Sequence, residues 1–363
     1  MMGRYNSCSG SSASLRMKAP VAYAALLAIA VVGCTPQHGP SSAPSSAEPA
    51  KSPPALHFRT YFAHTPNSGP ADIAVSSDGA VWFIEAHSPR NSIGFIDLKR
   101  RLTEFKFPAD QRLGGIAAAA NGGLWFSNYD SIGFITRAGH ITMFTIPGHE
   151  QPRLRDVDNL AVDRRGGVWF TDSGSFGGVI GRLTPDGAVT EQSVEGNPFD
   201  IAADPRGAVW FTLPDRNAIG KRSIDGDVVY YKVRTPHDVA HPNDRILRIA
   251  FGKPYIWFLN DEGSRIGRMT ETGNIVEYSV PDGAFLSIDG ASIDLSGIAV
   301  DKDDNAWFTQ SFGNQIGRFK PSGKLAQFTY PLAFAGPHGI AISDHEVWVT
   351  ALSANAVSVA RMP

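Results

Sequence analysis

Seven tryptophans divide this 363-residue sequence into units, and the residues that could do chemistry stand at fixed distances from them. Three positions after each tryptophan stand, in order, Glu85, Asn128, Asp172, Leu213, Asn260, Gln310 and Ala351. Immediately before the first isoleucine or leucine of each unit stand Asp72, Gly115, Asn159, Asp200, Arg248, Gly297 and Gly339. One position earlier stand Ala71, Gly114, Asp158, Phe199, Leu247, Ser296 and His338. These positions differ from unit to unit while the tryptophan does not, so they are the candidates for a site.

Two kinds of chemistry are open to these side chains. The carboxylates and amides among them are the hard oxygen ligands that Ca²⁺ and Mg²⁺ prefer, whereas His338 is an imidazole that titrates near neutral pH and could act as a base. An equally good interpretation is that Asp and Asn serve here as turn residues. We therefore predict His338 as the catalytic candidate and a set of ligand-binding residues at the same place: Glu85, Asp72, Asn128, Asp158, Asp172, Asp200, Arg248 and Ser296.

The elements that must position these residues follow from the repeat itself. The tryptophans are Trp82, Trp125, Trp169, Trp210, Trp257, Trp307 and Trp348, spaced 43, 44, 41, 47, 50 and 41 residues apart. All seven lie in one recurring phrase: Ile-Ala or Leu-Ala, a turn rich in Gly and Asp, Trp-Phe, Ile-Gly and a short alternating strand, with Trp-Val and no Ile-Gly in the seventh unit. A period of roughly 40–50 residues with four short strands is typical of a β-propeller. The sequence therefore predicts an all-β fold of seven four-stranded antiparallel blades, with the tryptophans packed between blades.

The two ends of the repeat indicate how the ring closes. The seventh unit has three strands and then the chain stops at Pro363, whereas the segment from Leu56 to Phe62 precedes the first unit and has the pattern of an outer strand. Pairing this segment with the seventh unit would remove the exposed edges that an open sheet leaves. We therefore predict one propeller domain over residues 56–363, and we expect a monomer.

Direction within the repeat places the candidate residues together. Strands one and two of a blade run antiparallel, so the residues before the first strand and those after Trp-Phe-x fall at the same end of the ring. That end would be the mouth of the central channel. We expect it to bind a small molecule or a peptide. The glycines of the Ile-Gly pairs are interpreted as places of close backbone approach at strand ends.

The first 33 residues have the features of a signal peptide. An apolar run from Val21 to Val32 follows Lys18 and is about a dozen residues long, too short for a bilayer, which needs roughly 20. Its ending, Val31-Val32-Gly33-Cys34, resembles a bacterial lipobox, which implies lipidation at Cys34. Residues 34–55 are rich in Pro, Ser and Ala and read as a tether. We expect the protein to be lipid-anchored to a bacterial membrane in the cell envelope; a cleaved, secreted protein is the alternative.

Composition excludes several classes of protein. The formal net charge of −2 provides no basic field for nucleic acid, which we do not expect as a partner. The two cysteines, Cys8 and Cys34, precede the predicted domain, so that domain holds neither a disulfide nor a thiolate metal site. No Gly-x-Ser-x-Gly elbow is present, so nucleophilic hydrolysis has no support.

The phrase Trp-Phe-Thr, followed by Asn-x-Ile-Gly-Arg and a Gly-x-x-x-x-Phe strand, resembles the virginiamycin B lyase (streptogramin B lyase) family over residues 56–363. The resemblance implies a seven-bladed propeller that opens a cyclic depsipeptide by Mg²⁺-dependent elimination at its ester linkage. In such a reaction a base removes the proton alpha to a carbonyl while the metal stabilises the developing enolate.

The resemblance also implies site residues, of which this sequence matches one. The family's last unit begins Glu-Pro-His-Gly-Ile, and here the segment Gly336-Pro-His-Gly-Ile340 keeps the histidine as His338. Gly336 stands where the family has a glutamate before this histidine. Leu352 stands where it has a glutamate four residues after the last tryptophan, and Ser296 stands where it has the histidine that begins the preceding unit. Streptogramin lyase activity is therefore expected to be absent or very weak.

Three functional hypotheses remain open from the sequence. The first is a lyase-like enzyme acting on a cyclic depsipeptide or a related ester or lactone, with a site rebuilt from Glu85, Asp172 and His338 and Mg²⁺ as its metal. The second is a non-catalytic envelope module whose mouth binds a peptide, a sugar or a partner protein. The third is a Ca²⁺-dependent lactonase, because gluconolactonase-type propellers place Glu, Asn and Asp around the axis. Whether His338, Glu85 and Asp172 share one cavity distinguishes the first hypothesis from the others.

Overall fold

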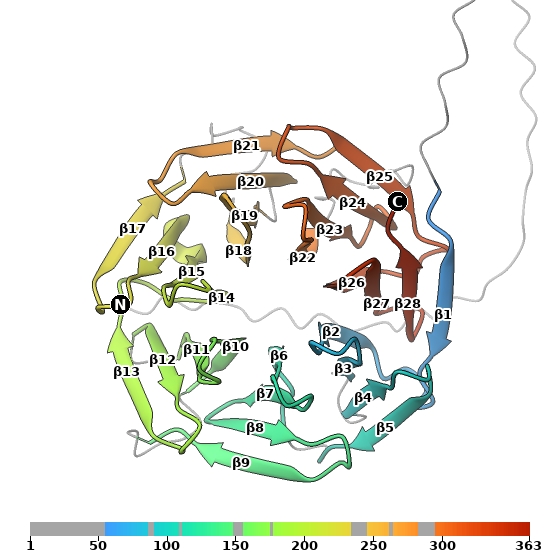
Figure 1. Ribbon diagram of the computed structural model, residues 1–363, viewed down its shortest axis with the longest axis horizontal. Coiled ribbons are helices and arrows are strands. Elements are labelled where there is room, and N and C mark those ends of the chain that lie inside the picture. Colours follow the sequence, from blue (N-terminus) through green and yellow to red (C-terminus); the bar gives the residue numbers. More distant parts are fainter. Residues whose placement is uncertain are drawn as a thin grey trace, which may run out of the picture. The chain divides into compact units, whose positions relative to one another are not determined.

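Seven four-stranded antiparallel sheets form a closed ring in this protein (Figure 1). The computed structural model describes residues 55–85, 91–108, 111–147, 155–174, 177–233, 245–260, 264–281 and 295–363. All of these lie in one unit, Ser52–Pro363. The predicted signal peptide, Cys34 and all but the last residue of the predicted tether lie outside the described residues. In the part of the chain that is described, no helix has the length and apolar character needed to cross a bilayer.

Each blade consists of four strands in order from the axis outward. The innermost strands are β2 (Pro70–Val75), β6 (Ile116–Ala118), β10 (Val157–Val162), β14 (Ile201–Ala203), β18 (Ile246–Phe251), β22 (Leu295–Val300) and β26 (Pro337–Ser343). The second strands, which carry the tryptophans, are β3 (Val81–Glu85), β7 (Leu124–Asn128), β11 (Val168–Asp172), β15 (Val209–Leu213), β19 (Tyr255–Asn260), β23 (Ala306–Gln310) and β27 (Glu346–Ala351).

The outer half of each blade repeats in the same way. The third strands are β4 (Ser92–Ile96), β8 (Ser131–Ile135), β12 (Val179–Leu183), β16 (Ala218–Arg222), β20 (Arg265–Thr270), β24 (Gln315–Phe319) and β28 (Ala356–Arg361). The outermost strands are β5 (Leu102–Lys106), β9 (Ile141–Thr145), β13 (Val189–Ser193), β17 (Val228–Lys232), β21 (Ile275–Ser279), β25 (Leu325–Thr329) and β1 (Phe58–Phe62). A 3₁₀ turn, Pro214–Arg216, connects β15 to β16.

The N-terminal strand closes the ring, as the sequence predicts. β1 pairs antiparallel with β28, from Phe58 opposite Ala360 to Phe62 opposite Ala356, and so completes the seventh blade. The hydroxyls of Thr60 and Ser358 lie 2.8 Å apart across this pair. The last blade is thus built from both ends of the domain, and Figure 1 shows β1 beside β28 in the ring.

A tryptophan lies at each junction between neighbouring blades, where packing was predicted. Trp82 of the first blade packs with Ile116, Leu124 and Ile135 of the second, and Trp348 of the seventh packs with Ile96 of the first. The other five junctions repeat this arrangement. Five of the seven indoles are fully buried. Since burial of an aromatic side chain is worth a few kcal/mol, the tryptophans hold the blades together.

The Ile-Gly glycines have a different place from the one predicted. They stand in the middle of the third strand and not at its end: Gly94 is the central residue of β4 and lies opposite Phe83. A Cβ atom on Gly94 would come within 2.1 Å of the Phe83 ring, and Gly267 has the same relation to Phe258, at 2.0 Å. The close approach is therefore between the glycine and the phenylalanine of Trp-Phe, which explains why these two residues recur together.

In five of the seven blades, a hydroxyl residue two positions after the tryptophan links the blade to the next one. Thr350 Oγ1 accepts a hydrogen bond from the Gly339 N–H of its own blade at 2.7 Å and donates to the Ala71 carbonyl of the first blade at 2.6 Å. Thr309 and Ser127 donate to the carbonyls of His338 and Asp158 in the same manner. These bonds satisfy buried backbone groups beside the axis.

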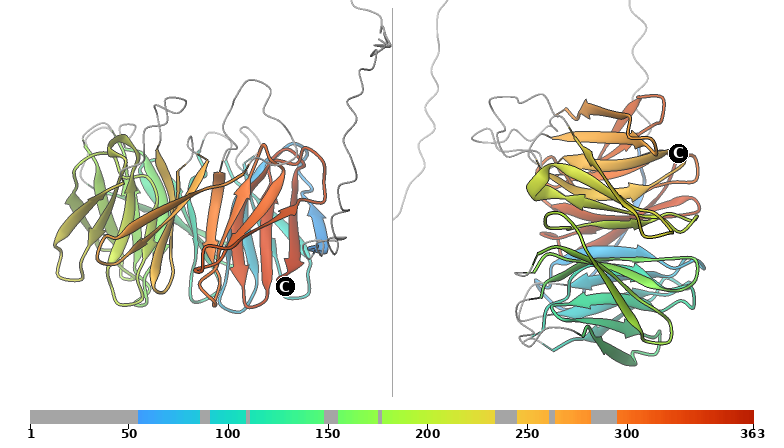
Figure 2. Two further views of the ribbon diagram at one scale, coloured as in Figure 1. Left: turned by 90° about the horizontal axis from the view of Figure 1, so that it is seen from above. Right: turned by 90° about the vertical axis from the view of Figure 1, so that its left-hand side faces the viewer.

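The ring has two faces, which Figure 2 shows edge-on. Innermost strands begin and second strands end at one of them, as the pairings Pro70–Glu85 and Val157–Asp172 show. We call this the mouth face, and the opposite one, where the first and second strands are joined by turns, the far face. The candidate residues of the sequence therefore do lie toward one face.

Candidate functional site

A cavity of about 140 Å³ lies on the axis toward the mouth face and is lined by all seven blades. Isoleucine, leucine and glycine form its apolar surface. Its polar side chains come from six of the blades: Asp72, Asn159, Asp200, Arg248, Ser296 and His338. Five of these six, all but Asn159, were predicted as site residues.

Irregular pairing at the start of the innermost strands directs these side chains to the axis. In five blades the register between the first two strands shifts just before the Ile-Ala pair, for example between Pro70 and Ile73 and between Pro337 and Ile340. A β-bulge of this kind re-aims the side chain that it contains. Asp72 and His338 lie inside such shifts, and this explains why the residues before Ile-Ala reach the cavity.

His338 is held by its backbone neighbours at the junction of the last blade with the first. Its Nδ1 lies 3.2 Å from the Ala71 carbonyl oxygen. A carbonyl oxygen can only accept a hydrogen bond, so Nδ1 carries the proton in this contact. The basic lone pair of the neutral ring is then on Nε2, and the ring is half-buried in the wall of the cavity.

Arg248 connects three blades across the cavity. Its Nε donates to the Ser296 carbonyl at 2.9 Å, and its Nη1 lies 3.4 Å from Asn159 Oδ1. The guanidinium also lies 5.5 Å from the centre of the Phe199 ring. Its charge is thus fixed in position at the axis, where it can meet a carbonyl or carboxylate oxygen of a ligand.

Asp200 lies beside this arginine and is a half-buried acid of the cavity. Burial raises its pKa to about 6, while Arg248 and the backbone N–H groups of Ile249 and Ile201 oppose the shift. Asp72 raises the pKa further by repulsion. Near neutral pH this carboxyl therefore exchanges a proton readily, which is a property of groups that bind or transfer protons.

Glu85 does not share the cavity with His338. It is fully buried at the end of β3, and its pKa is raised to about 7 by burial and by the nearby Glu104. Glu104 in turn accepts hydrogen bonds from Thr65 N and Thr65 Oγ1, in the segment between β1 and β2. The carboxyl therefore faces the interior of the first blade, away from the axis.

Asp172 is also turned away from the axis. One of its oxygens accepts from Arg155 Nη1 at 2.9 Å, and the same nitrogen pairs with Glu191 at 2.6 Å. Arg155 is buried, and sequence reasoning missed it because it precedes the repeat phrase of its blade. The structure thus does not bring Glu85, Asp172 and His338 together, and the rebuilt site expected from the sequence is not formed.

The two remaining predicted residues lie in the neighbouring blades, off the axis. Asn128 donates from Nδ2 to Gln111 Oε1 at 2.9 Å. Asp158 accepts from the Ser173 hydroxyl at 2.6 Å, and burial raises its pKa to about 6 against the effect of this hydrogen bond. Neither residue lines the cavity, so any part in binding would have to be played outside it.

The positions at which the family resemblance implies carboxylates are next to one another. The Leu352 N–H donates to the carbonyl of Gly336 at 3.0 Å, and Gly336 stands two residues before His338. Gly336 has a positive φ of 61°, and a Cβ there would come within 3.0 Å of Ser353 Oγ. Replacing Gly336 with glutamate would therefore strain the backbone at this position.

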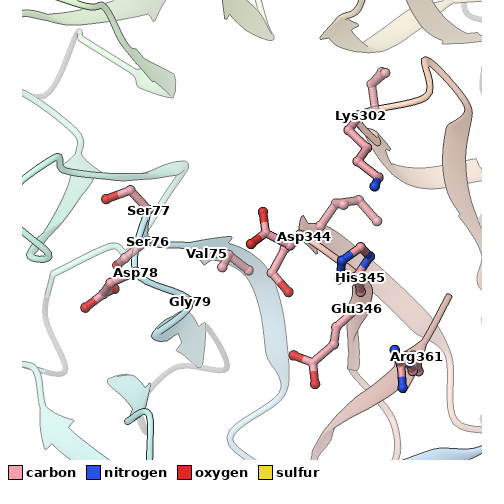
Figure 3. Close-up of a pocket in the computed structure, with 13 residues that line it drawn as sticks. Val75, Ser76, Ser77, Asp78, Gly79, Lys302, Asp344, His345, Glu346 and Arg361 are labelled. Carbon is pink, nitrogen blue, oxygen red and sulfur yellow. The ribbon is translucent and has the colours of Figure 1, made fainter.

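A larger cavity lies at the far face and does not contain the predicted residues. Its volume is about 690 Å³, and it is lined by the turns of the first, sixth and seventh blades. Figure 3 shows charges of both signs around it, among them Lys302, Asp344, His345 and Glu346. This mixture favours no class of ligand, so the axial cavity remains the better candidate.

The sequence profile of the virginiamycin B lyase family matches residues 55–253 and 249–362. The chain belongs to this family. A curated relative, the virginiamycin B lyase of Nocardia farcinica, is 28% identical over 218 residues, which cover 60% of this chain and 71% of the relative.

Solved structures of the family have the same fold. A streptogramin B lyase is 28% identical, with a TM-score of 0.72, over 85% of this chain and 98% of that one. The selenomethionine-substituted virginiamycin B lyase of Staphylococcus aureus is 25% identical, with a TM-score of 0.73, over 85% and 100%. A catalytically inactive histidine-to-alanine variant of the Staphylococcus aureus lyase, solved with quinupristin, is 25% identical, with a TM-score of 0.72, over the same shares.

The residues of the axial cavity fit Mg²⁺ poorly. Gly336 and Leu352, which stand beside the cavity wall where the family resemblance implies carboxylates, offer no side-chain oxygen. Within the cavity, the guanidinium of Arg248 occupies the side where Asn159 and Asp200 lie. Among the described residues, no three of His, Cys, Asp and Glu come together as metal ligands. We therefore derive no step of the chemistry through a metal.

Proposed function

We propose that this family member is a lyase-like propeller that binds a cyclic depsipeptide, or a related ester or lactone, at its axial cavity and opens it weakly or not at all. The observation that carries this proposal is the place of His338. The histidine of the family phrase Pro-His-Gly lines the axial cavity together with a fixed cation, Arg248. Quinupristin, a ligand of the inactive Staphylococcus aureus variant, is therefore the probe of choice.

His338 supplies the proton-abstracting half of an elimination. With Nδ1 hydrogen-bonded to Ala71, Nε2 accepts the proton from the carbon alpha to a carbonyl. The electron pair of that C–H bond forms a C=C bond, and the C–O bond of the ester breaks to release a carboxylate. No water is consumed. Arg248 is the group of the cavity that would attract the negative charge that develops.

The second half of the machinery is weak in this chain. The effects on the rate of groups that act together in one reaction are not additive. Removing one group that stabilises developing charge typically lowers the rate by about 10²–10³-fold. Gly336 and Leu352 stand where the family places carboxylates, and Ser296 stands where it places an imidazole. We therefore expect binding to survive better than turnover.

A second candidate function is binding without chemistry, as an envelope module for a peptide or another small molecule. It is favoured by the neighbouring residues Gly336 and Leu352, because neither supplies a carboxylate for the elimination. The two candidates share the cavity and differ in whether His338 changes the ligand covalently.

One experiment separates them. Purified residues 55–363 are incubated with quinupristin, with and without excess Mg²⁺, and the linear product is sought by mass spectrometry while binding is measured by calorimetry. We expect binding, with turnover at least about 100-fold below that of the Staphylococcus aureus lyase. His338→Ala should abolish any product, whereas His345→Ala, an exposed histidine at the far face, should change nothing.

Binding without product, unchanged in His338→Ala, would favour the non-catalytic candidate. No binding of quinupristin would contradict the proposed lyase-like function. Fast turnover that His338→Ala removes would show that other residues replace the missing carboxylates.

We further propose that the propeller is held in the cell envelope by lipidation at Cys34, which follows from the sequence features of residues 1–55. The mouth would then meet its ligand outside the cytoplasm, where an antibiotic-like molecule first arrives.

A further inference from the structure

A cavity of about 360 Å³ opens at the far face between the third and fourth blades. We call it the blade 3–4 groove. The turns β10–β11 and β14–β15 and the strands β11, β12 and β16 surround it. Five arginines line the groove: Arg164, Arg165, Arg182, Arg206 and Arg222. Such a concentration stands out in a chain whose formal net charge is −2.

Two aspartates in the groove neutralise only two of the five charges. Asp163 pairs with Arg182 at 2.7 Å, and Asp204 pairs with Arg206 at 2.7 Å. Arg206 has a second partner in Glu271. In the described part of the chain, neither Arg164, Arg165 nor Arg222 forms an ion pair with a carboxylate. The groove therefore keeps a surplus of positive charge.

Arg222 breaks the repeat of the fold. It lies opposite Val209, and six other residues take the equivalent place in the ladder between second and third strands: Ile96, Ile135, Leu183, Met269, Phe319 and Ala360. All six are apolar and buried, and they face the tryptophan of the preceding blade. Among the seven blades, only the fourth has a charged residue at this position of the ladder.

The guanidinium of Arg222 takes the place of an apolar side chain against Trp169. It lies 5.0 Å from the centre of the indole ring, and Arg182 lies 5.8 Å from the same ring. Arg222 Nε donates to Gln192 Oε1 at 2.7 Å, and its Nη1 donates to the Ser223 carbonyl at 3.0 Å. Both acceptors are neutral, so the geometry orients the charge without compensating it.

Placing a guanidinium in this position costs stability. Burial and the neighbouring Arg182 lower the pKa of Arg222 below its ordinary value. A half-buried charge without a counter-charge is unfavourable, and the six other blades show that the fold does not need one here. An anion in the groove would remove this penalty.

We propose that the blade 3–4 groove is a binding site for a phosphate group carried by a small molecule, with Arg222 at its inner end and Arg164 and Arg165 at its rim. Guanidinium groups match phosphate oxygens with paired hydrogen bonds. A volume of about 360 Å³ is within the range of small-molecule sites. The groove is at the far face, so this site is separate from the axial cavity at the mouth face.

The test uses pyrophosphate as the probe, at an ionic strength held constant with sodium chloride. Binding to the full domain is measured by calorimetry and by the rise of Tm with pyrophosphate concentration, because a ligand that binds only the folded state stabilises it. Arg222→Met restores the apolar residue of the repeat and should raise Tm without ligand. It should also weaken pyrophosphate binding at least about tenfold, since a charge-assisted hydrogen bond is lost.

A second variant keeps the test independent of folding. Arg165→Gln changes an exposed rim residue and should weaken binding about threefold to tenfold with Tm unchanged. Lys99→Gln, which removes an exposed positive charge from the first blade, is the matched control and should bind as the unchanged protein does.

The source of the phosphate is distinguished in a separate arm with phosphatidylglycerol vesicles. If the protein sediments with the vesicles and Arg222→Met abolishes this sedimentation, the phosphate group belongs to a lipid headgroup. Pyrophosphate binding without sedimentation assigns the phosphate group to a soluble molecule. The proposal is overturned if pyrophosphate has no more effect than sodium chloride, or if Arg222→Met and Arg165→Gln bind as tightly as Lys99→Gln.

Discussion

Burial governs the acids that stand at the mouth face. Glu85, Asp158 and Asp200 all have pKa values raised above the ordinary range, to about 7, 6 and 6, and in each case desolvation is the largest cause. Asp78, in a far-face turn, behaves in the opposite way: the Arg137 hydrogen bond lowers its pKa. Burial and hydrogen bonding thus shift the pKa values of these carboxyl groups in opposite directions.

This difference predicts how stability depends on pH. The folded-state pKa of Glu85, about 7, exceeds its ordinary value of 4.5, so its stability contribution is fully present below pH 4.5 and is lost as pH rises through 7. The free energy of unfolding should therefore rise as pH falls from 8 to 5. Glu85→Gln should remove about 2–3 kcal/mol of that rise. Urea denaturation at each pH measures it.

Glu195→Gln is the control, because Glu195 is exposed on the ring surface. It should leave the pH profile unchanged. An identical slope in Glu85→Gln and in the unchanged protein would show that this carboxyl does not titrate in the neutral range.

Sequence reasoning identified the residues before Ile-Ala better than those after Trp-Phe-x. Asp72 and His338 line the cavity because they lie inside the register shift at the start of the innermost strand, and Arg248 directly follows such a shift. Glu85 and Asp172 are at the correct face but point elsewhere, one into its own blade and the other to Arg155. Side-chain direction depends on such local irregularities and on partners outside the repeat, which spacing along the sequence does not reveal.

At the scale of the blade, recurrence in the sequence has three separate physical causes. The tryptophan packs between blades, the phenylalanine after it lies against the glycine of Ile-Gly, and the hydroxyl after that bonds to the next blade. The number of blades, their four strands and the closing strand follow from this phrase. The role of the hydroxyl does not, because the phrase alone does not show that its partner is a carbonyl in another blade.

The hydroxyl links can be tested at Thr350. Thr350→Val keeps the shape of the side chain, removes the acceptor of the Gly339 N–H, and leaves the Ala71 carbonyl with the longer contact to His338 Nδ1. Two buried backbone groups lose a hydrogen bond, so we expect unfolding to be easier by about 2–4 kcal/mol. Thr350→Ser keeps the hydroxyl and should cost less, about 1 kcal/mol. Urea denaturation compares the two.

The hydroxyl link is absent from blades one and five, so these two junctions are joined without it. These blades have Ile84 and Leu259 where the other five blades have a hydroxyl, and both side chains are buried. A loss in Thr350→Val no larger than in Thr350→Ser would mean that packing, and not the hydrogen bond, joins these blades.

At the scale of the whole molecule, the ring depends on strand β1. Deleting residues 35–54 should leave the free energy of unfolding unchanged, since β1 remains. Deleting residues 35–63 should expose the edge of β28 and cause aggregation or a large loss of stability. Thermal unfolding and light scattering measure both. A soluble second product of equal stability would contradict the need for closure.

The proposed anchor is tested at Cys34, with the full chain in a bacterial host. Cys34→Ser should move the protein from the membrane fraction to the soluble fraction or leave its leader uncleaved. More than one acyl chain on this cysteine should make the anchored form resist a salt wash. Cys8→Ser is the matched control and should not change the fractionation. Release of the unchanged protein by salt alone would argue against lipidation.

A blade built from both ends has a consequence for how the protein is made. Thr60 and Ser358 are 298 positions apart, so β1 stays without its partner until nearly all of the chain has been synthesised. A product that ends early lacks β28 and presents no edge to receive β1, and proteases act readily on such unpaired ends. The seventh blade thus serves as a check on the completeness of the propeller domain, because β1 and β28 pair only when both have been made.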